Sequence, residues 1–211
     1  MAPLILLALL AFADRPPIDA VVLIEESPRT RIQRIEIRFT EGDRMAIMTF
    51  NSRTHLKLRF TDNPAQIARA IHAPWLGVSM FSTKADPHIH VLDAIAKANA
   101  LFSETPAPER RRAVILLFSS EDENSKSNID QLHAALVKTG TKLALAAIDG
   151  ETPISDDEKL SQAPVPRPGP PQIRVTRYPI PDRTMELLRP LTTYTQRNSW
   201  NLDKLLDSIR Q

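Results

Sequence analysis

The run Ala113-Val114-Ile115-Leu116-Leu117-Phe118 is the most strongly strand-like stretch of the 211-residue chain. An unbroken apolar run of this length is typical of a strand that is buried on both faces of a parallel sheet. Comparable runs occupy residues 20–24, 45–50 and 142–148. Residues 55–60 instead alternate polar and apolar side chains, and only residues 51–53 separate them from the preceding run. This segment is therefore expected to be a half-exposed edge strand, antiparallel to its neighbour.

Segments with helical spacing alternate with these strands. Asn63-Pro64 has the form of an N-cap followed by a first-turn proline, and Asp86-Pro87 repeats it before an apolar segment that reaches Phe102. Two more helices are marked by Ile129, Leu132 and Leu136, with Gly140 as the terminator, and by Leu202, Leu205, Leu206 and Ile209. The alternation predicts an α/β fold, a doubly wound and mostly parallel sheet with helices on both faces and one antiparallel edge strand.

The composition excludes several classes of protein. Apolar residues make up 42% of the chain and charged residues 25%, which is incompatible with a fully disordered chain. Because there is no cysteine, disulfide scaffolds, thiolate metal sites and cysteine nucleophiles are excluded. The formal net charge of +2 gives no reason to expect nucleic acid or an anionic membrane as a partner. The 5 glycines form no phosphate-binding motif, and we expect no cofactor.

The first 13 residues have the features of an export signal. The apolar run at 4–12 is too short to span a bilayer, which takes about 20 helical residues. It has the length of a signal core, and Ala11-Phe12-Ala13 has the small-x-small form of a cleavage site, although residues 1–3 lack the usual positive charge. The alternative is a buried first strand or helix. We expect a signal peptide at 1–13, a single domain over 14–211, and a secreted or periplasmic location.

Residues 151–181 differ from the rest of the chain in composition. They contain 8 prolines and a single glycine. Such a segment cannot form a core helix or a central strand, because proline fixes φ and lacks a backbone N–H. It is therefore expected to be an exposed, extended loop inserted into the domain.

Several segments have a recognisable order and spacing. They are Val21-Val22-Leu23-Ile24 followed by Glu25-Glu26-Ser27-Pro28-Arg29, then Gly42-Asp43-Arg44-Met45-Ala46 with Thr49-Phe50-Asn51, then Leu92-Asp93-Ala94-Ile95, and finally residues 110–122. Together they resemble a von Willebrand factor A (VWA) domain of the bacterial, secreted type, over roughly residues 19–148. The resemblance implies a Rossmann-like, doubly wound fold and the binding of other proteins. In many members it also implies a metal-ion-dependent adhesion site for magnesium or a similar cation.

The chain departs from the family pattern at this metal site. The positions of the family's Asp-x-Ser-x-Ser sequence fall on Glu25, Ser27 and Arg29. The family's threonine falls on Ile89, and its aspartate after the fourth strand falls on Ser119. Magnesium needs near-octahedral oxygen ligands, which an isoleucine and an arginine cannot supply. We therefore expect a degenerate adhesion site with no metal ligands.

Functional residues of a doubly wound sheet lie at the carboxyl ends of its strands. The resemblance, the signal-like amino terminus and the substituted metal positions together predict an exported protein-binding or structural module that is metal-independent and is not an enzyme. Its expected partner is another protein, without stable membrane insertion after removal of the signal. Besides the degenerate positions, the expected partner face consists of Glu26, His88, His90, Ser120, Glu121 and Asp122.

The alternative function is a hydrolytic or metal-assisted α/β enzyme that uses Glu25, His88, His90 and Asp122.

Several residues also have a purely structural interpretation. Of the neighbours Glu25 and Glu26, one is expected in solvent and the other at the rim of the site. The acidic residues 121–123 are expected to stabilise the amino end of a helix that starts near Ser127. The arginines 110–112 are expected to form a solvated turn or a patch for an anionic partner. Trp75 is expected in a loop, as a core anchor or as a partner contact.

Overall fold

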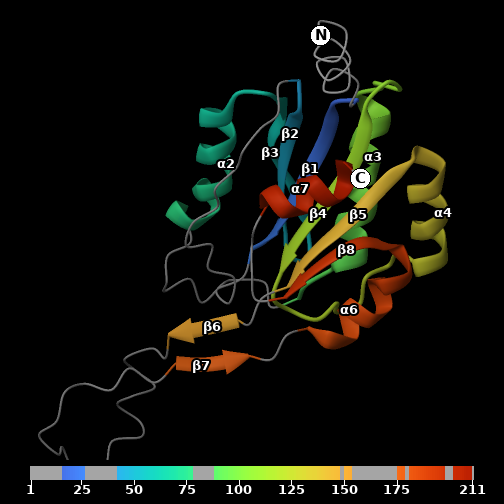
Figure 1. Cartoon of the computed structure of the whole chain (residues 1–211). Coiled ribbons are helices and arrows are strands. Elements are labelled where there is room, and N and C mark those ends of the chain that lie inside the picture. Colours follow the sequence, from blue (N-terminus) through green and yellow to red (C-terminus); the bar gives the residue numbers. More distant parts are fainter. Residues whose placement is uncertain are drawn as a thin grey trace, which may run out of the picture.

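The apolar runs form the centre of a six-stranded sheet (Figure 1). Its strands, in spatial order, are β3 (Thr54–Thr61), β2 (Arg44–Phe50), β1 (Ile18–Glu25), β4 (Arg111–Phe118), β5 (Thr141–Ala147) and β8 (Thr192–Arg197). All neighbouring strands are parallel except β2 and β3, which are antiparallel. The expected fold class and its antiparallel edge strand are confirmed. The computed structural model describes residues 16–26, 42–77, 88–147, 150–153, 175–178, 181–197 and 202–210.

Helices cover both faces of the sheet (Figure 1). One face packs against α2 (Pro64–Gly77) and α7 (Leu202–Arg210). The other packs against α3 (Val91–Glu104), α4 (Ile129–Thr139) and α6 (Asp182–Leu188), and a 3-10 turn, Arg189–Leu191, follows α6. In β1 the side chains of Val22 and Ile24 join the first layer, whereas those of Val21 and Leu23 join the second. Because both directions are buried, the strand has a continuous apolar run instead of an alternating one.

Local signals set the ends of two predicted helices. The Asn63 Oδ1 atom accepts hydrogen bonds from the backbone N–H groups of Ala65 (3.0 Å) and Gln66 (3.1 Å), which confirms the predicted N-cap of α2. Gly140, the predicted terminator of α4, has φ 64°. Glycine adopts this left-handed conformation more readily than any other residue, so the helix ends there.

Other helix boundaries differ from the expectation. α3 begins at Val91, so His88 and His90 precede the helix, whereas the predicted start at Asp86-Pro87 lies outside the described residues. Trp75 lies within α2 and not in a loop, because this helix continues beyond it. The loop interpretation of Trp75 was therefore wrong.

The chain after β5 contains elements that composition does not predict. β6 (Gly150–Pro153) and β7 (Val175–Tyr178) pair antiparallel in a separate two-stranded sheet, so the ends of the expected loop at 151–181 form strands. Residues 154–174 lie outside the described part of the chain. α6 and β8 follow, and β8 completes the main sheet. Within the described ranges, none of the helices has both the length and the apolar character needed to cross a membrane.

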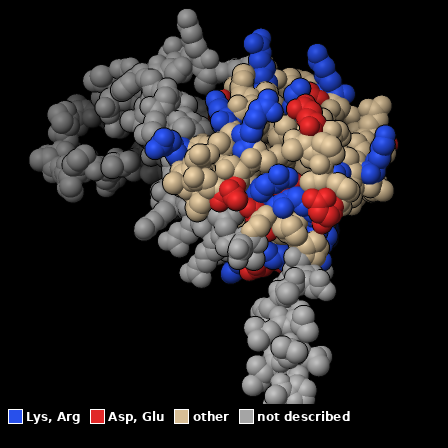
Figure 2. Space-filling model, turned by 90° about the horizontal axis from the view of Figure 1, so that it is seen from above, with Lys and Arg blue, Asp and Glu red and all other residues tan. Residues whose placement is uncertain are grey.

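A buried carboxylate, that of Asp19, binds two arginines at the end of the sheet where the parallel strands begin. Asp19 is almost fully buried, and Arg44 donates to both of its oxygens, from Nε (2.9 Å) and Nη2 (2.7 Å). The hydrogen bond with Asp19 raises the pKa of Arg44 above its already high usual value. Arg110 Nε also donates to Asp19, at 2.5 Å. Figure 2 views this edge and shows basic and acidic side chains interspersed on it.

The other two arginines of the predicted patch also bind the protein itself. Arg111 donates to the backbone carbonyl groups of Ile209 (3.4 Å) and Arg210, at the carboxyl end of α7. A cation is favourable at this end of a helix because the last carbonyl groups lack partners. Arg112 donates to the carbonyl group of Thr139 (3.1 Å) at the end of α4. The arginines 110–112 therefore form hydrogen bonds with β1 and with the carboxyl ends of α7 and α4. The solvated-turn and patch interpretations were wrong.

Candidate functional site

The carboxyl ends of β1 and β4 meet around a buried carboxylate. Glu25 is the last residue of β1 and is fully buried. Ser119 donates to it from the backbone N–H (2.6 Å to Oε2) and from the hydroxyl (3.2 Å to Oε1). Ser120 donates in the same two ways, from the N–H (3.0 Å to Oε2) and the hydroxyl (2.6 Å to Oε1). One carboxylate oxygen thus accepts both amide hydrogens, and the other accepts both hydroxyl hydrogens.

This hydrogen bonding explains how a carboxylate can lie inside the protein. A buried charged group is tolerated only when its oxygens have donors, and Glu25 has donors on both. Glu25 is therefore neither solvated nor at the rim, which corrects the expectation for it. The side chain of Glu26 is only partly exposed, and its Oε1 atom lies 3.0 Å from Lys57 Nζ.

Two of the positions that the resemblance assigns to an adhesion site, Ile89 and Ser119, have other contacts in the structure. The Ile89 side chain is 3% exposed and packs in the apolar layer that contains α3. The Ser119 hydroxyl, which would have to face the metal, donates to Glu25 instead. Ser27 and Arg29 lie outside the described residues. Within the described part of the chain, histidine and acidic side chains nowhere gather in threes to hold a metal ion.

The loop after β4 supplies the amino-terminal cap of α3. Asp122 Oδ1 accepts hydrogen bonds from the backbone N–H groups of Val91 (2.6 Å) and Leu92 (3.2 Å) and from the Ser125 hydroxyl (2.6 Å). The first N–H groups of a helix have no partner within it, and a carboxylate there also interacts favourably with the helix dipole. The local N-cap residue, His90, makes no such bond with its side chain. The cap therefore comes from a residue 31 positions away in sequence.

Replacing Asp122 with alanine is expected to lower the free energy of unfolding by about 1–2 kcal/mol, the usual effect of losing an N-cap. The matched control is Asp130→Ala, because Asp130 is exposed in the first turn of α4, where Asn128 is the cap. Urea unfolding of both variants measures the difference. Equal stability of the two variants would show that Asp122 does not cap α3.

Glu121 caps a different helix, α6. Its carboxylate accepts hydrogen bonds from the backbone N–H groups of Arg183 (3.1 Å) and Thr184 (2.7 Å) and from the Thr184 hydroxyl (2.6 Å). The helix after this loop, α4, is capped instead by Asn128, whose Oδ1 atom accepts from the Asp130 N–H at 2.8 Å. Glu121 and Asp122 thus cap the amino ends of α6 and α3, and not the helix expected near Ser127.

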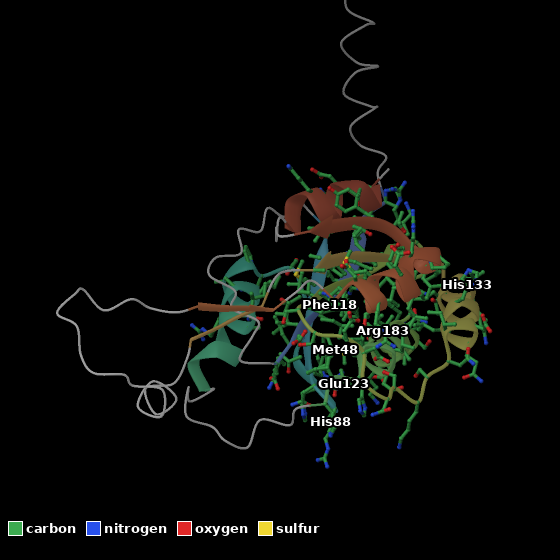
Figure 3. The ribbon with its side chains drawn as sticks, turned by 90° about the horizontal axis from the view of Figure 1, so that it is seen from below. Met48, His88, Phe118, Glu123, His133 and Arg183 are labelled. Atoms are coloured by element: carbon green, nitrogen blue, oxygen red, sulfur yellow. The ribbon has the colours of Figure 1, made fainter. Side chains whose placement is uncertain are left out.

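The two histidines each lie beside a different carboxylate. His88 Nδ1 is 3.1 Å from Glu123 Oε2, and both side chains are exposed (Figure 3). His90 Nδ1 is 3.7 Å from Asp93 Oδ2, in the first turn of α3. Both histidines precede α3, whereas a helix that started at Asp86-Pro87 would have included them.

The pKa of Asp93 provides a pH-dependent test of this region. Partial burial opposes ionisation of Asp93, but hydrogen bonds from Ser127 and from the N–H of Lys126 outweigh it and lower the pKa below its usual value. Ionised Asp93 therefore stabilises the folded chain above the unfolded-state pKa of about 4, and this contribution is lost as the pH falls below that value. We expect the stability difference between wild type and Asp93→Asn to shrink between about pH 6 and pH 3. A constant difference across this range, measured by urea unfolding, would contradict the assignment.

Hydrogen bonds join the loops at this edge into one surface. The His90 N–H donates to the Asn51 carbonyl (3.0 Å), and the Glu123 N–H donates to the carbonyl of the residue before His90 (2.7 Å). The Asp122 N–H donates to the Thr184 hydroxyl (2.7 Å). We call this surface, which Figure 3 views directly, the carboxyl-edge face. It comprises Glu26, Asn51, His88, His90 and residues 121–126 and 182–183.

The predicted site residues that the structure describes do meet at this edge, although in separate groups. Glu25, Ser119 and Ser120 form the buried cluster, and Ile89 packs in the apolar layer with α3. The other described residues of the predicted site lie on the carboxyl-edge face. Sequence reasoning missed Ser125, Asp93 and Thr184, because their roles depend on contacts with distant segments and no local spacing marks them.

The residues of the enzymatic alternative do not converge. Glu25 binds the two serines after β4, and Asp122 binds the amino end of α3. His88 lies beside Glu123, and His90 lies beside Asp93.

Comparisons with known proteins find similarity in structure alone. No protein-family model matches the sequence, and no curated protein is similar enough to count as a match. The structure is similar to that of an aerotolerance-related membrane protein from Bacteroides fragilis with multiple mutations to serines, with a TM-score of 0.59 and 13% identity over 91% of this chain and 98% of that one. It is equally similar to a conserved hypothetical protein, BatB, from Bacteroides thetaiotaomicron, with a TM-score of 0.59 and 15% identity over 92% and 96% of the two chains.

A structure described as the SpRpn10 VWA domain is also similar, with a TM-score of 0.45 and 13% identity over 68% of this chain and 80% of that one, a likeness too low to support an argument. At such identities the comparisons establish the fold alone. The chain has a doubly wound, Rossmann-like α/β fold with one antiparallel edge strand. This is the VWA-like fold that the sequence resemblance implies.

Proposed function

We propose that this chain is an exported module that binds another protein through the carboxyl-edge face, without a metal ion and without catalysis. The mature module spans residues 14–211 as a single domain. The observation that supports the proposal most strongly is the saturation of Glu25 by the amide and hydroxyl groups of Ser119 and Ser120. A carboxylate bound in this way has no need of a cation, and a cation would have to displace these donors.

The acidic groups around Glu25 support the same proposal. Glu121 and Asp122 accept hydrogen bonds from the amino ends of α6 and α3, so their oxygens are also engaged. Because these bonds join several loops, they give the carboxyl-edge face a fixed shape without a ligand. A preformed surface loses less conformational entropy when a partner binds, which favours a binding role.

Export is proposed from the signal-like residues 1–13, which lie outside the described residues. One structurally similar protein is described as a membrane protein, which is compatible with a role at the cell envelope. Amino-terminal sequencing of the protein from its native host is expected to begin at or near Asp14. An intact Met1 on the folded protein would contradict export with cleavage.

The binding proposal is tested by capture on the immobilised mature chain. Proteins from the exported fraction of the source cells are captured, identified, purified and then titrated against variants. Lys126→Glu and Arg183→Glu change exposed residues of the carboxyl-edge face, and Lys138→Glu is the matched change on the exposed side of α4. We expect the two face variants to weaken binding, the α4 variant to bind normally, and a chelator to have no effect. Release by the chelator, or equal binding by all three variants, would contradict the proposal.

A further inference from the structure

The outer edge of β3 concentrates positive charge outside the carboxyl-edge face. β3 is the end strand of the sheet, and within the described residues no strand pairs with its outer side (Figure 1). Residues 51–61 contain Arg53, Lys57 and Arg59 and no acidic residue. These three side chains and that of His55 occupy alternate positions, and all four residues are exposed. We call these four residues the β3 strip.

Irregular pairing with β2 interrupts the ladder at this strip. Leu56 and Leu58 pair with successive residues of β2, which makes Lys57 an extra residue. A second irregularity lies between Leu58 and Thr61, the interval that contains Arg59. Such bulges leave the extra residue unpaired and redirect its side chain. A second strand therefore cannot form a regular series of backbone hydrogen bonds along the outer side of β3. A partner at this edge has to be bound through side chains.

The basic side chains also protect the edge strand, because charged residues, lysine especially, discourage edge-to-edge association. Lys57 pairs with Glu26, but the guanidinium groups of Arg53 and Arg59 have no ion pair within the described residues. In a dimer formed through this edge, the positive charges of one strip would face those of the other, and this repulsion disfavours such a dimer.

The surroundings of the strip favour a polypeptide over a nucleic acid. Leu56 is 37% exposed between the basic residues and offers an apolar contact. Phe60, which follows the strip in β3, packs its ring against Phe102 with 5.6 Å between ring centroids, and the Arg44 guanidinium lies over it at 5.7 Å. It is therefore not available for the base stacking that typically supports single-stranded nucleic-acid binding.

We propose that the β3 strip is a second interaction surface, which adjoins the carboxyl-edge face through the Lys57–Glu26 ion pair and binds an extended acidic segment of another protein through side-chain contacts. In an extended chain, alternate residues are about 6.6–6.8 Å apart, so a flexible peptide with acidic side chains at every second position offers charges along the whole strip, although the bulges make the spacing of the strip itself irregular. The proposal is independent of the function proposed for the carboxyl-edge face.

The test uses a fluorescent decapeptide of alternating Thr and Glu, with Thr-Gln and Thr-Lys counterparts and a thymidine oligonucleotide of equal charge to the first peptide. Fluorescence anisotropy at low ionic strength measures binding. We expect the Thr-Glu peptide alone to bind the wild type, and Arg53→Glu with Arg59→Glu to weaken it by at least about fivefold. The same double variant is expected to bind the Thr-Lys peptide instead, a gain that simple unfolding cannot produce.

The matched control is Lys97→Glu with Lys138→Glu, which makes the same change of charge on exposed positions of α3 and α4. This variant is expected to bind the Thr-Glu peptide as the wild type does. Equal weakening in both double variants would mean that net charge, and not the strip, attracts the peptide. That result, the absence of peptide binding, or tighter binding of the oligonucleotide would overturn the proposal.

Discussion

Glu25→Ala is expected to lower the free energy of unfolding by about 3–5 kcal/mol, because buried donors that lose their acceptor are each costly. The substitution leaves two N–H groups and two hydroxyl groups of Ser119 and Ser120 without the carboxylate that binds them. Glu25→Gln keeps the size of the side chain but replaces one acceptor oxygen with a donor. We expect it to lose about 1.5–3 kcal/mol, the range for hydrogen bonds to a charged group.

The neighbouring residue provides the control for this prediction. Glu26 lies next to Glu25 in sequence, but its partner is the exposed amine of Lys57. Exposed ion pairs contribute little, so Glu26→Ala is expected to change stability by less than about 1 kcal/mol. Urea unfolding of the three variants gives the comparison. A loss for Glu25→Ala no larger than that for Glu26→Ala would mean that the buried cluster does not stabilise the carboxyl edge.

Asp19→Ala is expected to destabilise the opposite edge of the sheet by a similar amount, about 3–5 kcal/mol. The Asp19 side chain is 3% exposed and accepts hydrogen bonds from both Arg44 and Arg110. Its removal leaves two guanidinium groups without their common partner. Arg110 also donates to the carbonyl group of Ile18, so the start of β1 loses part of its support.

Asp207→Ala is the matched control for Asp19→Ala. Asp207 also binds an arginine, with Arg210 Nη1 at 2.8 Å, but its side chain is 65% exposed. Solvent replaces its interactions readily, so we expect a loss of less than about 1 kcal/mol. Urea unfolding at high and low salt distinguishes the two sites, because added salt screens only the exposed pair strongly. Similar losses in both variants would contradict the central role of Asp19.

The strands that are buried on both faces of the sheet could be predicted, because such burial requires a continuous apolar run. β1, β4 and β5 lie inside the sheet with helices on both faces, and their apolar runs reflect this directly. β8 lies at the edge, and its polar sequence Thr-Thr-Tyr-Thr-Gln-Arg contains no apolar run to mark it. The hairpin from β2 to β3 was predictable because a short turn between two strands leaves few other arrangements.

The candidate site was predictable in position but not in its bonding. The carboxyl ends of the strands indicated where Glu25, Ser119 and Asp122 would lie. Their partners depend on contacts between segments far apart in sequence, such as the bonds from Ser119 to Glu25 across 94 positions. For the same reason the start of α3 was misplaced, since its cap is Asp122 from a later loop and not a local residue.

Calorimetric titration of the mature chain with magnesium, manganese and calcium tests the central claim most directly. The buried Glu25 carboxylate is already bound by Ser119 and Ser120, so we expect no binding heat for any of these cations at up to about 1 mM. Glu25→Gln, which removes the charge, is expected to behave as the wild type does in this titration. A dissociation constant below about 1 mM that is lost in Ser27→Ala would contradict the account and indicate a functional metal site.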